Sequence, residues 1–219
     1  MSSKAGSLSG HLDAVCVVAQ LHDDAGSVGT TAIDKRPITG AVRVHDLGVW
    51  GDIQADRANH GGTYQAVYAY ATEDAEWWAD ELGRDLPPGS FGENLRISGM
   101  DVSGALVGER WRIGDVVLEA TSPRIPCKTF ARWLEQEGWL RRFNDARRHG
   151  AYLRVVNKGT IEAGQEVEII HRPSHGTSIR LPLERDPEAA LRLLEDLSVS
   201  DADPGPDMVA TAQRLADRA

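Results

Sequence analysis

Short runs of β-forming residues, separated by glycine and proline, recur along most of this chain and restrict what it can fold into. The runs are residues 13–20, 31–44, 65–70, 91–97, 105–107, 109–113, 116–120, 151–156 and 166–170. Gly114-Asp115 favours a tight turn, and the turn at residues 157–159 predicts a hairpin between residues 151–156 and 166–170. Many short strands joined in this way predict a β-barrel or sandwich-like core.

Helical patterns occupy a smaller part of the chain. The clearest is residues 72–82, since Thr72 can act as N-cap, Glu73 and Asp74 favour a helix N-terminus, and Gly83 suits the position after the last turn. Further helices are expected at residues 129–136, 139–148, 187–197 and 206–216. The fold class is therefore mainly β with helices (α+β).

The character of the chain changes after His171, where a segment with proline, serine and glycine begins. We expect a flexible N-terminus at residues 1–12, a β-rich domain at residues 13–171, and a helical C-terminal extension at residues 172–219. From Glu184 to the end, nine acidic residues outnumber four basic ones. We see no pattern of chemical function in this extension.

Composition and charge argue against several classes of protein. The 219 residues are 41% hydrophobic and 26% charged, as is usual for a soluble globular protein. A net charge of −9 argues against binding of a nucleic acid polymer through general basicity. No signal peptide and no run of about 18 apolar residues that could span a membrane is seen. With two cysteines and no zinc-ligand spacing, we expect a cytoplasmic protein in reducing surroundings.

Cys127 lies between the expected strand 116–120 and the expected helix 129–136. Two prolines stiffen the segment before it, because each fixes a backbone φ angle. The neighbouring cations Arg124 and Lys128 favour the thiolate, which is the nucleophilic and metal-ligating form of cysteine. Cys127 is therefore a candidate reactive residue.

A buried thiol with only a packing role is the alternative for Cys127, because unpaired cysteines are among the most buried residues. We interpret Cys16 in this way, since it lies in the apolar run of residues 14–18.

Positive charge is concentrated around Cys127. From residue 121 to residue 158 the chain has nine Lys or Arg and three Asp or Glu, a local net charge of +6, so the other residues carry −15. This distribution favours a small anionic ligand. The alternative, which we expect for most of them, is that four arginines only solvate a helix face: Arg141, Arg142, Arg147 and Arg148.

A second segment, residues 48–62, is dense in groups that can contact a ligand. Gly61 and Gly62 would let a ligand approach the backbone, and the strand expected at residues 65–70 follows them. The polar side chains of this segment are Asp52, Gln54, Asp56, Arg57, Asn59 and His60.

The residues alone leave three hypotheses open. Cys127 ligates a soft metal in an anionic cofactor that basic side chains hold. Alternatively, Cys127 is a nucleophile with His60 or His149 as its base. In the third hypothesis the protein is a binding module and its cysteine is structural.

Four segments together resemble the MOSC family (the molybdenum cofactor sulfurase C-terminal domain), and their order and spacing agree over residues 13–170. The segments are Lys35 with Pro37 and Gly40, residues 51–62, residues 91–95 and residues 122–127. The resemblance implies a strongly bent β-barrel-like core with a few helices. It also implies a molybdopterin cofactor and no pyridoxal phosphate, since that chemistry belongs to a separate domain of the full sulfurase.

Site residues follow from the resemblance by matching position. Cys127 would ligate molybdenum or carry sulfur, and His60 would donate a proton. The cofactor would be held by Lys35, Arg57, Gly61, Gly62, Gly92, Asn94 and Arg124. We interpret Glu93 as structural, because a carboxylate would repel an anionic cofactor. Residues 63–65 replace the proline and charged residue that often follow His-Gly-Gly in the stand-alone bacterial branch, so substrate contacts there are expected to differ.

The activity implied by the resemblance is reduction of an N-hydroxyl group. Relatives include the mitochondrial amidoxime-reducing component, and the stand-alone bacterial branch is linked to N-hydroxylated purines such as 6-N-hydroxylaminopurine. The alternative is a carrier of the cofactor, or of persulfide sulfur on Cys127, without turnover of its own. No flavin, haem or iron–sulfur motif is seen, so electrons are expected from a separate donor protein; a homodimer stays open.

Overall fold

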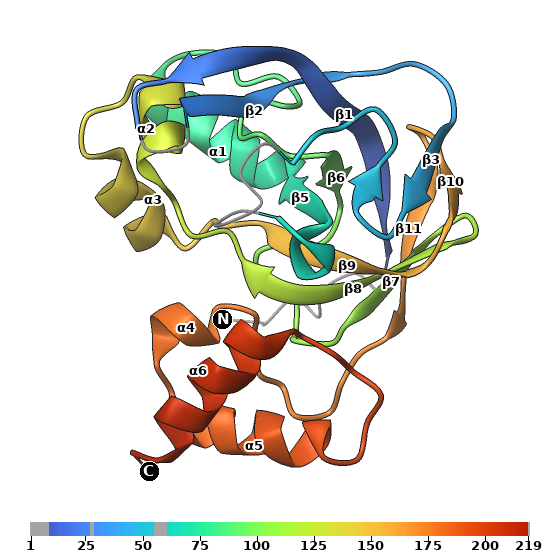
Figure 1. Cartoon of the computed structure of the whole chain (residues 1–219), viewed down its shortest axis with the longest axis vertical. Coiled ribbons are helices and arrows are strands. Elements are labelled where there is room, and N and C mark those ends of the chain that lie inside the picture. The colour runs from blue at the N-terminus through green and yellow to red at the C-terminus, as the bar shows by residue number, and fades with distance from the viewer. Residues whose placement is uncertain (1–8, 27–28, 55–60, 219) are drawn as a thin grey trace.

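Seven strands close into a barrel, with helices on two sides of it (Figure 1). The computed structural model describes residues 9–26, 29–54 and 61–218. The strand order around the barrel is β11, β7, β8, β9, β5, β6 and β1, and pairing of β1 with β11 closes the ring. The barrel strands are β1 Ser9–Asp24, β5 Val67–Ala71, β6 Leu95–Ser98, β7 Arg110–Ile113, β8 Val116–Pro123, β9 Ala151–Asn157 and β11 Glu166–His171. The predicted α+β class with a β-barrel core is confirmed.

Further strands lie outside the ring. β2 Gly29–Pro37 extends the sheet beyond β1. A separate three-stranded sheet consists of β10 Gly159–Ile161, β3 Val42–His45 and β4 Gly48–Val49. A short 3-10 helix, η1 Thr63–Gln65, precedes β5. Among the described residues, no helix is long and apolar enough to cross a membrane.

Strand β1 is long enough to take part in both the barrel and its extension. Its first residues pair with β6 and β11, and its second half pairs with β2. Register shifts after Leu12 and after Val18 mark irregularities of the kind that bend a strand. The strand begins at Ser9, so residues 9–12 are not the flexible segment that we expected; their partners lie far away in the sequence. Residues 1–8 lie outside the described part of the chain.

The hairpin predicted between residues 151–156 and 166–170 is wrong. β9 pairs with β5 and β8, whereas β11 pairs with β7 and β1. The turn expected at residues 157–159 is not formed either, because β10 begins at Gly159, with one residue between it and the end of β9, and pairs with β3. Asparagine and glycine close together therefore did not mark a turn here, and the strand that each segment joins is decided by distant residues.

The predicted helix at residues 72–82 is confirmed as α1 Thr72–Leu82, and Gly83 ends it with a φ of 62°. Its N-cap is Ala71 rather than Thr72. The Thr72 hydroxyl donates to the Asp13 carboxylate on β1 instead. The helices predicted at 129–136 and 139–148 are α2 Lys128–Leu134 and α3 Trp139–Ala146, both slightly shorter than expected.

Buried aromatic side chains hold these three helices against the barrel. Trp78 of α1 and Trp139 of α3 have ring centroids 4.5 Å apart, and Phe130 of α2 packs edge-on against Phe143 at 5.2 Å. The cluster also contains Tyr70, Phe91 and Leu134. Because Phe130 is completely buried here, the start of α2 is fixed relative to the barrel.

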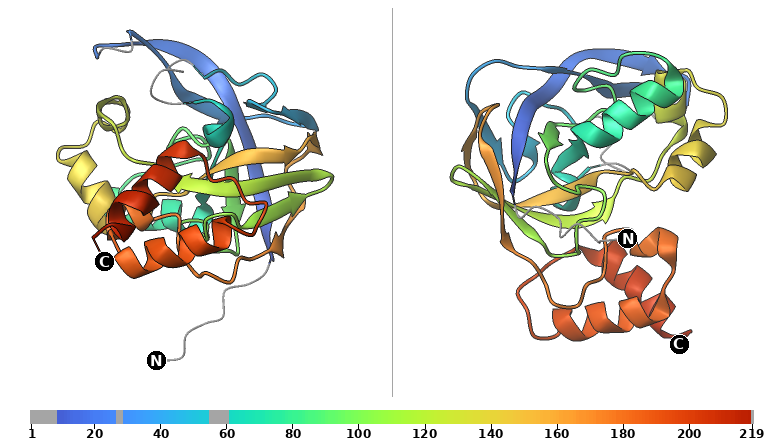
Figure 2. Two further views of the ribbon diagram at one scale, coloured as in Figure 1. Left: turned by 60° about the horizontal axis from the view of Figure 1, so that its bottom comes forward. Right: turned by 180° about the vertical axis from the view of Figure 1, so that it is seen from behind.

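The C-terminal extension packs on the other side of the barrel (Figure 2). It consists of α4 Leu181–Glu184, α5 Pro187–Leu197 and α6 Pro206–Ala216, so the two helices predicted there are confirmed. Leu193, Met208 and Leu215 belong to the same buried core as Leu118 of the barrel. The completely buried Glu119 of β8 also accepts a hydrogen bond from the backbone of Asp203 (2.9 Å). The extension therefore shares its core and a polar anchor with the barrel.

Candidate functional site

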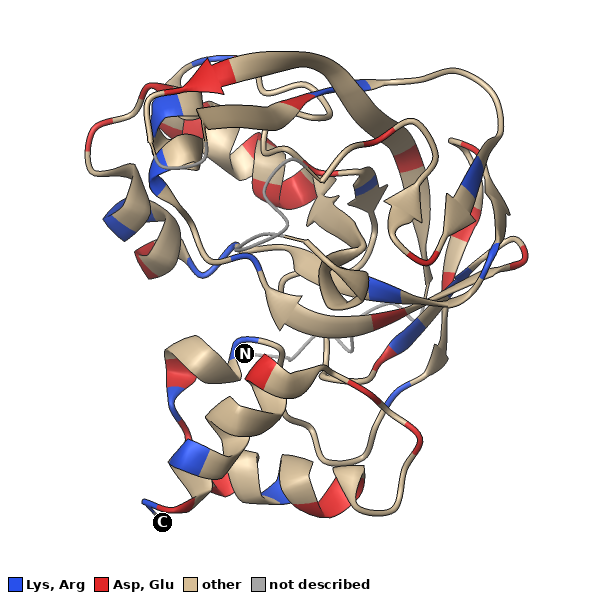
Figure 3. Ribbon diagram, viewed as in Figure 1, with Lys and Arg blue, Asp and Glu red and all other residues tan. Residues whose placement is uncertain are grey.

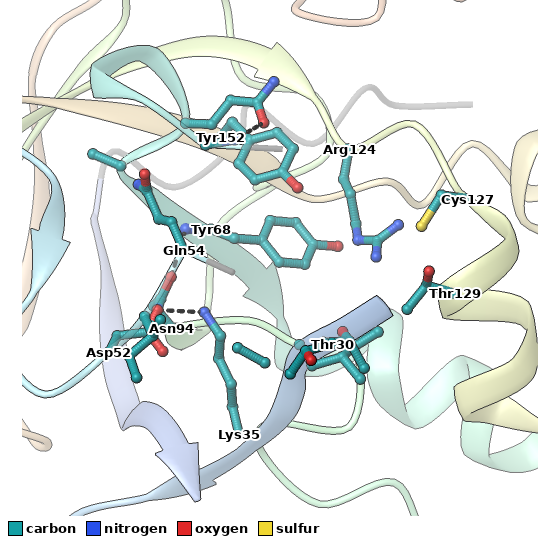
Figure 4. Close-up of a pocket in the computed structure, with 18 residues that line it drawn as sticks. Thr30, Lys35, Asp52, Gln54, Tyr68, Asn94, Arg124, Cys127, Thr129 and Tyr152 are labelled. Carbon is teal, nitrogen blue, oxygen red and sulfur yellow. Dashed lines mark hydrogen bonds and ion pairs between the residues drawn. The ribbon is translucent and has the colours of Figure 1, made fainter. Parts of the chain in front are cut away.

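A cavity of about 140 Å³ opens between the start of β2, the end of β8 and the loops before β5 and β6 (Figure 4). It brings together residues that lie far apart in the sequence. The predicted site residues that line it are Lys35, Gly61, Gly92, Asn94, Arg124 and Cys127. Gly62 is not among the lining residues. Arg57 and His60 lie outside the described residues, so their roles stay predictions.

Cys127 stands between β8 and α2, as predicted from the sequence. It is the N-cap residue of α2, with extended backbone angles (φ −119°, ψ 170°). Its side chain is partly buried, and Figure 4 shows the sulfur directed toward the guanidinium of Arg124. The thiol therefore faces the cavity from a fixed position beside a positive charge.

Arg124 is buried and rests on aromatic rings. Its guanidinium carbon lies 3.9 Å from the ring centroid of Phe130 and 5.8 Å from that of Tyr68. Within the part of the chain that the structure describes, it donates to the carbonyl of Ile125 (3.4 Å) and pairs with no carboxylate. Its positive charge is thus available to an anion in the cavity.

The other cations of the basic stretch do not line the cavity. Arg132 pairs with Asp24, and Arg154 with Glu119. Arg141 is 90% exposed beside Asp145, as expected for a residue that solvates a helix face. In Figure 3 the Lys and Arg positions, coloured blue on the ribbon, are spread over several elements. Of the basic residues in this stretch, Arg124 lines the cavity. The local net charge of +6 therefore overstates the positive charge at the site.

Lys35 comes from β2 and meets a carboxylate on the opposite loop. Its ammonium donates to Asp52 (2.6 Å), and Asn94 donates to the same oxygen (2.8 Å). The other carboxylate oxygen of Asp52 accepts from the backbone of Val18 (3.0 Å). The charge of Lys35 is therefore balanced by Asp52, a residue that the sequence analysis noted as polar but did not place in the site.

Asn94 acts mainly as a connector. Its amide donates to the Cys16 carbonyl (3.2 Å) and to Asp52, and its oxygen accepts from the backbone of Tyr68 (3.1 Å). These contacts occupy the side chain and join β1, β5 and the loop of Asp52. In this structure Asn94 orients Lys35 through Asp52.

The glycines have local reasons for their positions. Gly61 has a φ of 150°, and a Cβ there would lie 2.7 Å from the side-chain oxygen of Gln54. At Gly92, with a φ of 74°, a Cβ would lie 3.0 Å from Ile33. Gly62 has a φ of 81° and open space around it. Backbone conformation and packing thus account for Gly61 and Gly92 without a cofactor.

Glu93 holds the loop that carries Gly92 and Asn94. It is completely buried, and its two oxygens accept from the backbones of Gly89 (2.8 Å) and Phe91 (3.0 Å). The guanidinium of Arg96 donates to the same carboxylate (2.8 Å). This agrees with our interpretation of Glu93 as structural.

His149 does not support the hypothesis of a cysteine–histidine pair. It is completely buried against Phe143 and is not among the residues that line the cavity. Its Nε2 lies 3.2 Å from the side-chain oxygen of Asn144. It is therefore a core histidine.

Acidification is expected to destabilise the fold through His149. Burial lowers its pKa from 6.5 to about 4, with the charge of Arg180 as the second cause. Between these two pH values the unfolded chain binds a proton that the folded chain does not, so the free energy of unfolding falls as the pH falls. In urea titrations, the free energy of unfolding should fall between pH 7 and pH 4 by about 3 kcal/mol more in the wild type than in His149→Gln. Equal losses in the two proteins would contradict this.

Several cavity residues were missed by the sequence analysis. Tyr68 and Tyr152 come from neighbouring strands β5 and β9, and Thr30, Thr31 and Thr129 add hydroxyl groups. Tyrosine and threonine are ordinary strand residues, so nothing in their local pattern distinguishes them. The pairing of β5 with β9 brings the two tyrosines together, and that pairing is not visible in the sequence.

Comparison with known proteins identifies the family. The family model of the MOSC domain matches residues 56–168. The chain belongs to the MOSC family. Over 150 residues it is 32% identical to the uncharacterized protein YflK of Bacillus subtilis, covering 68% of each protein. It is also 32% identical over 152 residues to a protein of Gibberella moniliformis named reductase, covering 66% of this chain and 26% of that protein.

Solved structures of MOSC proteins share the fold. The crystal structure of YiiM from Geobacillus stearothermophilus superposes with a TM-score of 0.73 at 22% sequence identity. The match covers 94% of this chain and 98% of that one. It therefore includes the helical extension as well as the barrel.

Proposed function

We propose that this MOSC protein binds a molybdenum cofactor and reduces N-hydroxylated purine bases to amines. The observation that carries the proposal is the meeting of a thiol, Cys127, with two basic side chains, Arg124 and Lys35, at one cavity. Soft metals prefer thiolate ligands, and cations bind the phosphate of a pterin cofactor through charge-assisted hydrogen bonds. The name of the reductase relative supports reductive chemistry in the same family.

The residues present fit such a cofactor. Cys127 would ligate the metal, and Arg124, which has no carboxylate partner among the described residues, would take the anionic part. Lys35 would add a second donor whose position Asp52 fixes. Tyr68 and Phe130 hold the guanidinium of Arg124 by cation–π contacts. The side chains thus provide a soft ligand and oriented positive charge in one place.

A cofactor held by these residues would supply two-electron redox chemistry. In the overall reaction the N–O bond breaks, the oxygen leaves as water, and two electrons and two protons are consumed for each N-hydroxyl group. The electrons come from a separate donor protein. His60 stays the predicted proton donor.

Molybdenum content tests this proposal. Protein from a host that makes the cofactor should contain about one molybdenum per chain, and Cys127→Ala should retain less than about a tenth of it. Cys16→Ala is the matched control, because it removes the buried core thiol and should leave the content unchanged.

Other outcomes separate the proposal from its alternatives. Molybdenum in the wild type without reduction of 6-N-hydroxylaminopurine, when a chemical reductant is supplied, would identify a carrier. No molybdenum in a folded wild type would contradict the proposal and favour sulfur transfer by Cys127.

A further inference from the structure

A second cavity adjoins the first and is the larger of the two, about 360 Å³. The two cavities share Gly61, Gln65 and Tyr152 as lining residues. Its volume lies within the range of about 300–1,000 Å³ that is usual for small-molecule sites. The function proposed above uses the first cavity and leaves this one without a role.

The C-terminal extension forms one wall of this second cavity. Pro182, Pro204, Met208 and Thr211 line it from the extension, and Ile125 lines it from the loop after β8. Figure 1 shows α6 below the end of β8, on the side where the barrel faces the extension. The extension thus encloses space beside the candidate cofactor site, although its sequence showed no pattern of chemical function.

This wall is fixed to the barrel by Tyr64. The Tyr64 hydroxyl donates to Asp203 (3.0 Å). Gly205, with a φ of 86°, lies flat against the Tyr64 ring, since a Cβ there would lie 2.7 Å from it. Asp203 and Gly205 both belong to the segment between α5 and α6. The wall therefore has a defined position relative to the loop before β5.

The border between the two cavities is also built from hydrogen bonds. The Thr121 hydroxyl lies within hydrogen-bonding distance of the carbonyls of Tyr64 (2.6 Å) and Tyr152 (3.0 Å). The side chain of Gln65 accepts from the backbone of Gly61 (3.2 Å). Thr121 thus joins the Tyr64 anchor of the extension to Tyr152, which lines both cavities.

The two cavities differ in charge. Lys35 and Arg124 line the first. Among the described residues that line the second there is no Lys or Arg, and Asp207 contributes a carboxylate. Proline, tyrosine, isoleucine and methionine supply flat or apolar surface, with Ser122 and Thr211 as neutral polar groups. An uncharged aromatic heterocycle suits this lining, whereas a phosphate would lack a cation and face Asp207.

We infer that the second cavity holds the ring of the substrate, and that the substrate is a neutral N-hydroxylated base or nucleoside rather than a nucleotide. This inference rests on the proposed function. The ring lies between α6 and Ile125 in the loop after β8, and the N-hydroxyl group crosses the shared border at Tyr152 toward Cys127. The C-terminal extension is then the element that selects the substrate.

Filling the cavity from α6 tests the inference. Thr211→Phe should raise the KM for 6-N-hydroxylaminopurine about tenfold or more, since the added ring occupies the substrate's space. Hydroxylamine, which has no ring, should be reduced by the variant as by the wild type. The matched control is Gln213→Phe, at an exposed position of the same helix that does not line the cavity. The 5′-phosphate of the N-hydroxylated nucleoside should have a KM at least about tenfold above that of the nucleoside.

A binding measurement keeps the test independent of turnover. Adenine, the amine product, should bind the wild type and Gln213→Phe in calorimetry about tenfold more tightly than Thr211→Phe. Equal effects of Thr211→Phe on the purine and on hydroxylamine, equal adenine binding by all three proteins, or preference for the nucleotide would overturn the inference. No turnover of either substrate by a molybdenum-loaded wild type would instead overturn the proposed function, and adenine binding would still decide the inference.

Discussion

Cys127→Ser is expected to reduce the turnover of 6-N-hydroxylaminopurine by more than about 100-fold. Replacing a residue that only contacts a metal ligand already lowers metal affinity or activity by about 10–100-fold, and Cys127 is the proposed ligand itself. Serine keeps the size of the side chain but replaces a soft ligand by a hard hydroxyl. The measurement is kcat with a chemical reductant, at matched cofactor loading. The N-cap position of Cys127 tolerates serine well, so the fold should persist.

The other cysteine provides the control for this prediction. Burial raises the pKa of Cys16 to about 12, so it stays a thiol at neutral pH. Cys16→Ala should keep its activity, and brief treatment of the cofactor-free protein with iodoacetamide should modify Cys127 and prevent later turnover in both the wild type and Cys16→Ala. Full activity in Cys127→Ser would show that the thiol is not needed and would remove the central residue from the proposed site.

Local signals predicted a large part of this fold. The helix at residues 72–82 was found with its bounds because an acidic first turn and a C-terminal glycine both lie within a few residues of it. The position of Cys127 between a strand and a helix was found for the same reason, since β8 and α2 each have a clear local pattern. Such features depend on the nearest neighbours in the chain.

Long-range pairing could not be predicted from those signals. Residues 159–161 join β3 instead of returning along β9, and Ser9 pairs with Glu168 on the last barrel strand in the sequence. The cavity itself is a product of such pairings, because Lys35, Asn94 and Cys127 come from three separate regions. Family resemblance, rather than periodicity, had brought these three residues together in the sequence analysis.

Charge density along the sequence was a weaker guide. Nine basic residues lie between positions 121 and 158, yet most of those with a clear contact pair with acidic partners elsewhere, as Arg148 does with Asp74 and Arg154 with Glu119. Arg124 differs because it is buried at the cavity and pairs with no carboxylate among the described residues. A cation that binds a ligand is thus recognised by its surroundings in space rather than by its neighbours in sequence.

Glu93→Gln is expected to lower the free energy of unfolding by about 3–5 kcal/mol, the usual cost of breaking a buried ion pair from one side. Glu93 and Arg96 are both buried, and each oxygen of the carboxylate accepts from a backbone N–H of the same loop. A glutamine amide would direct an N–H group at one of these donors and leave Arg96 without its counter-charge. Urea unfolding at pH 7 measures the change.

Two further variants show whether the cost comes from the buried charge. Glu93→Gln/Arg96→Met removes both charges and should recover part of the lost stability, since apolar replacement of a whole buried pair is often close to neutral. Glu168→Gln breaks the half-exposed pair with Arg112 on the barrel surface and should cost less than about 1 kcal/mol. If Glu93→Gln costs no more than Glu168→Gln, the loop of Gly92 and Asn94 does not depend on Glu93. Otherwise Glu93→Gln should also weaken cofactor retention, because this loop orients Lys35 through Asn94 and Asp52.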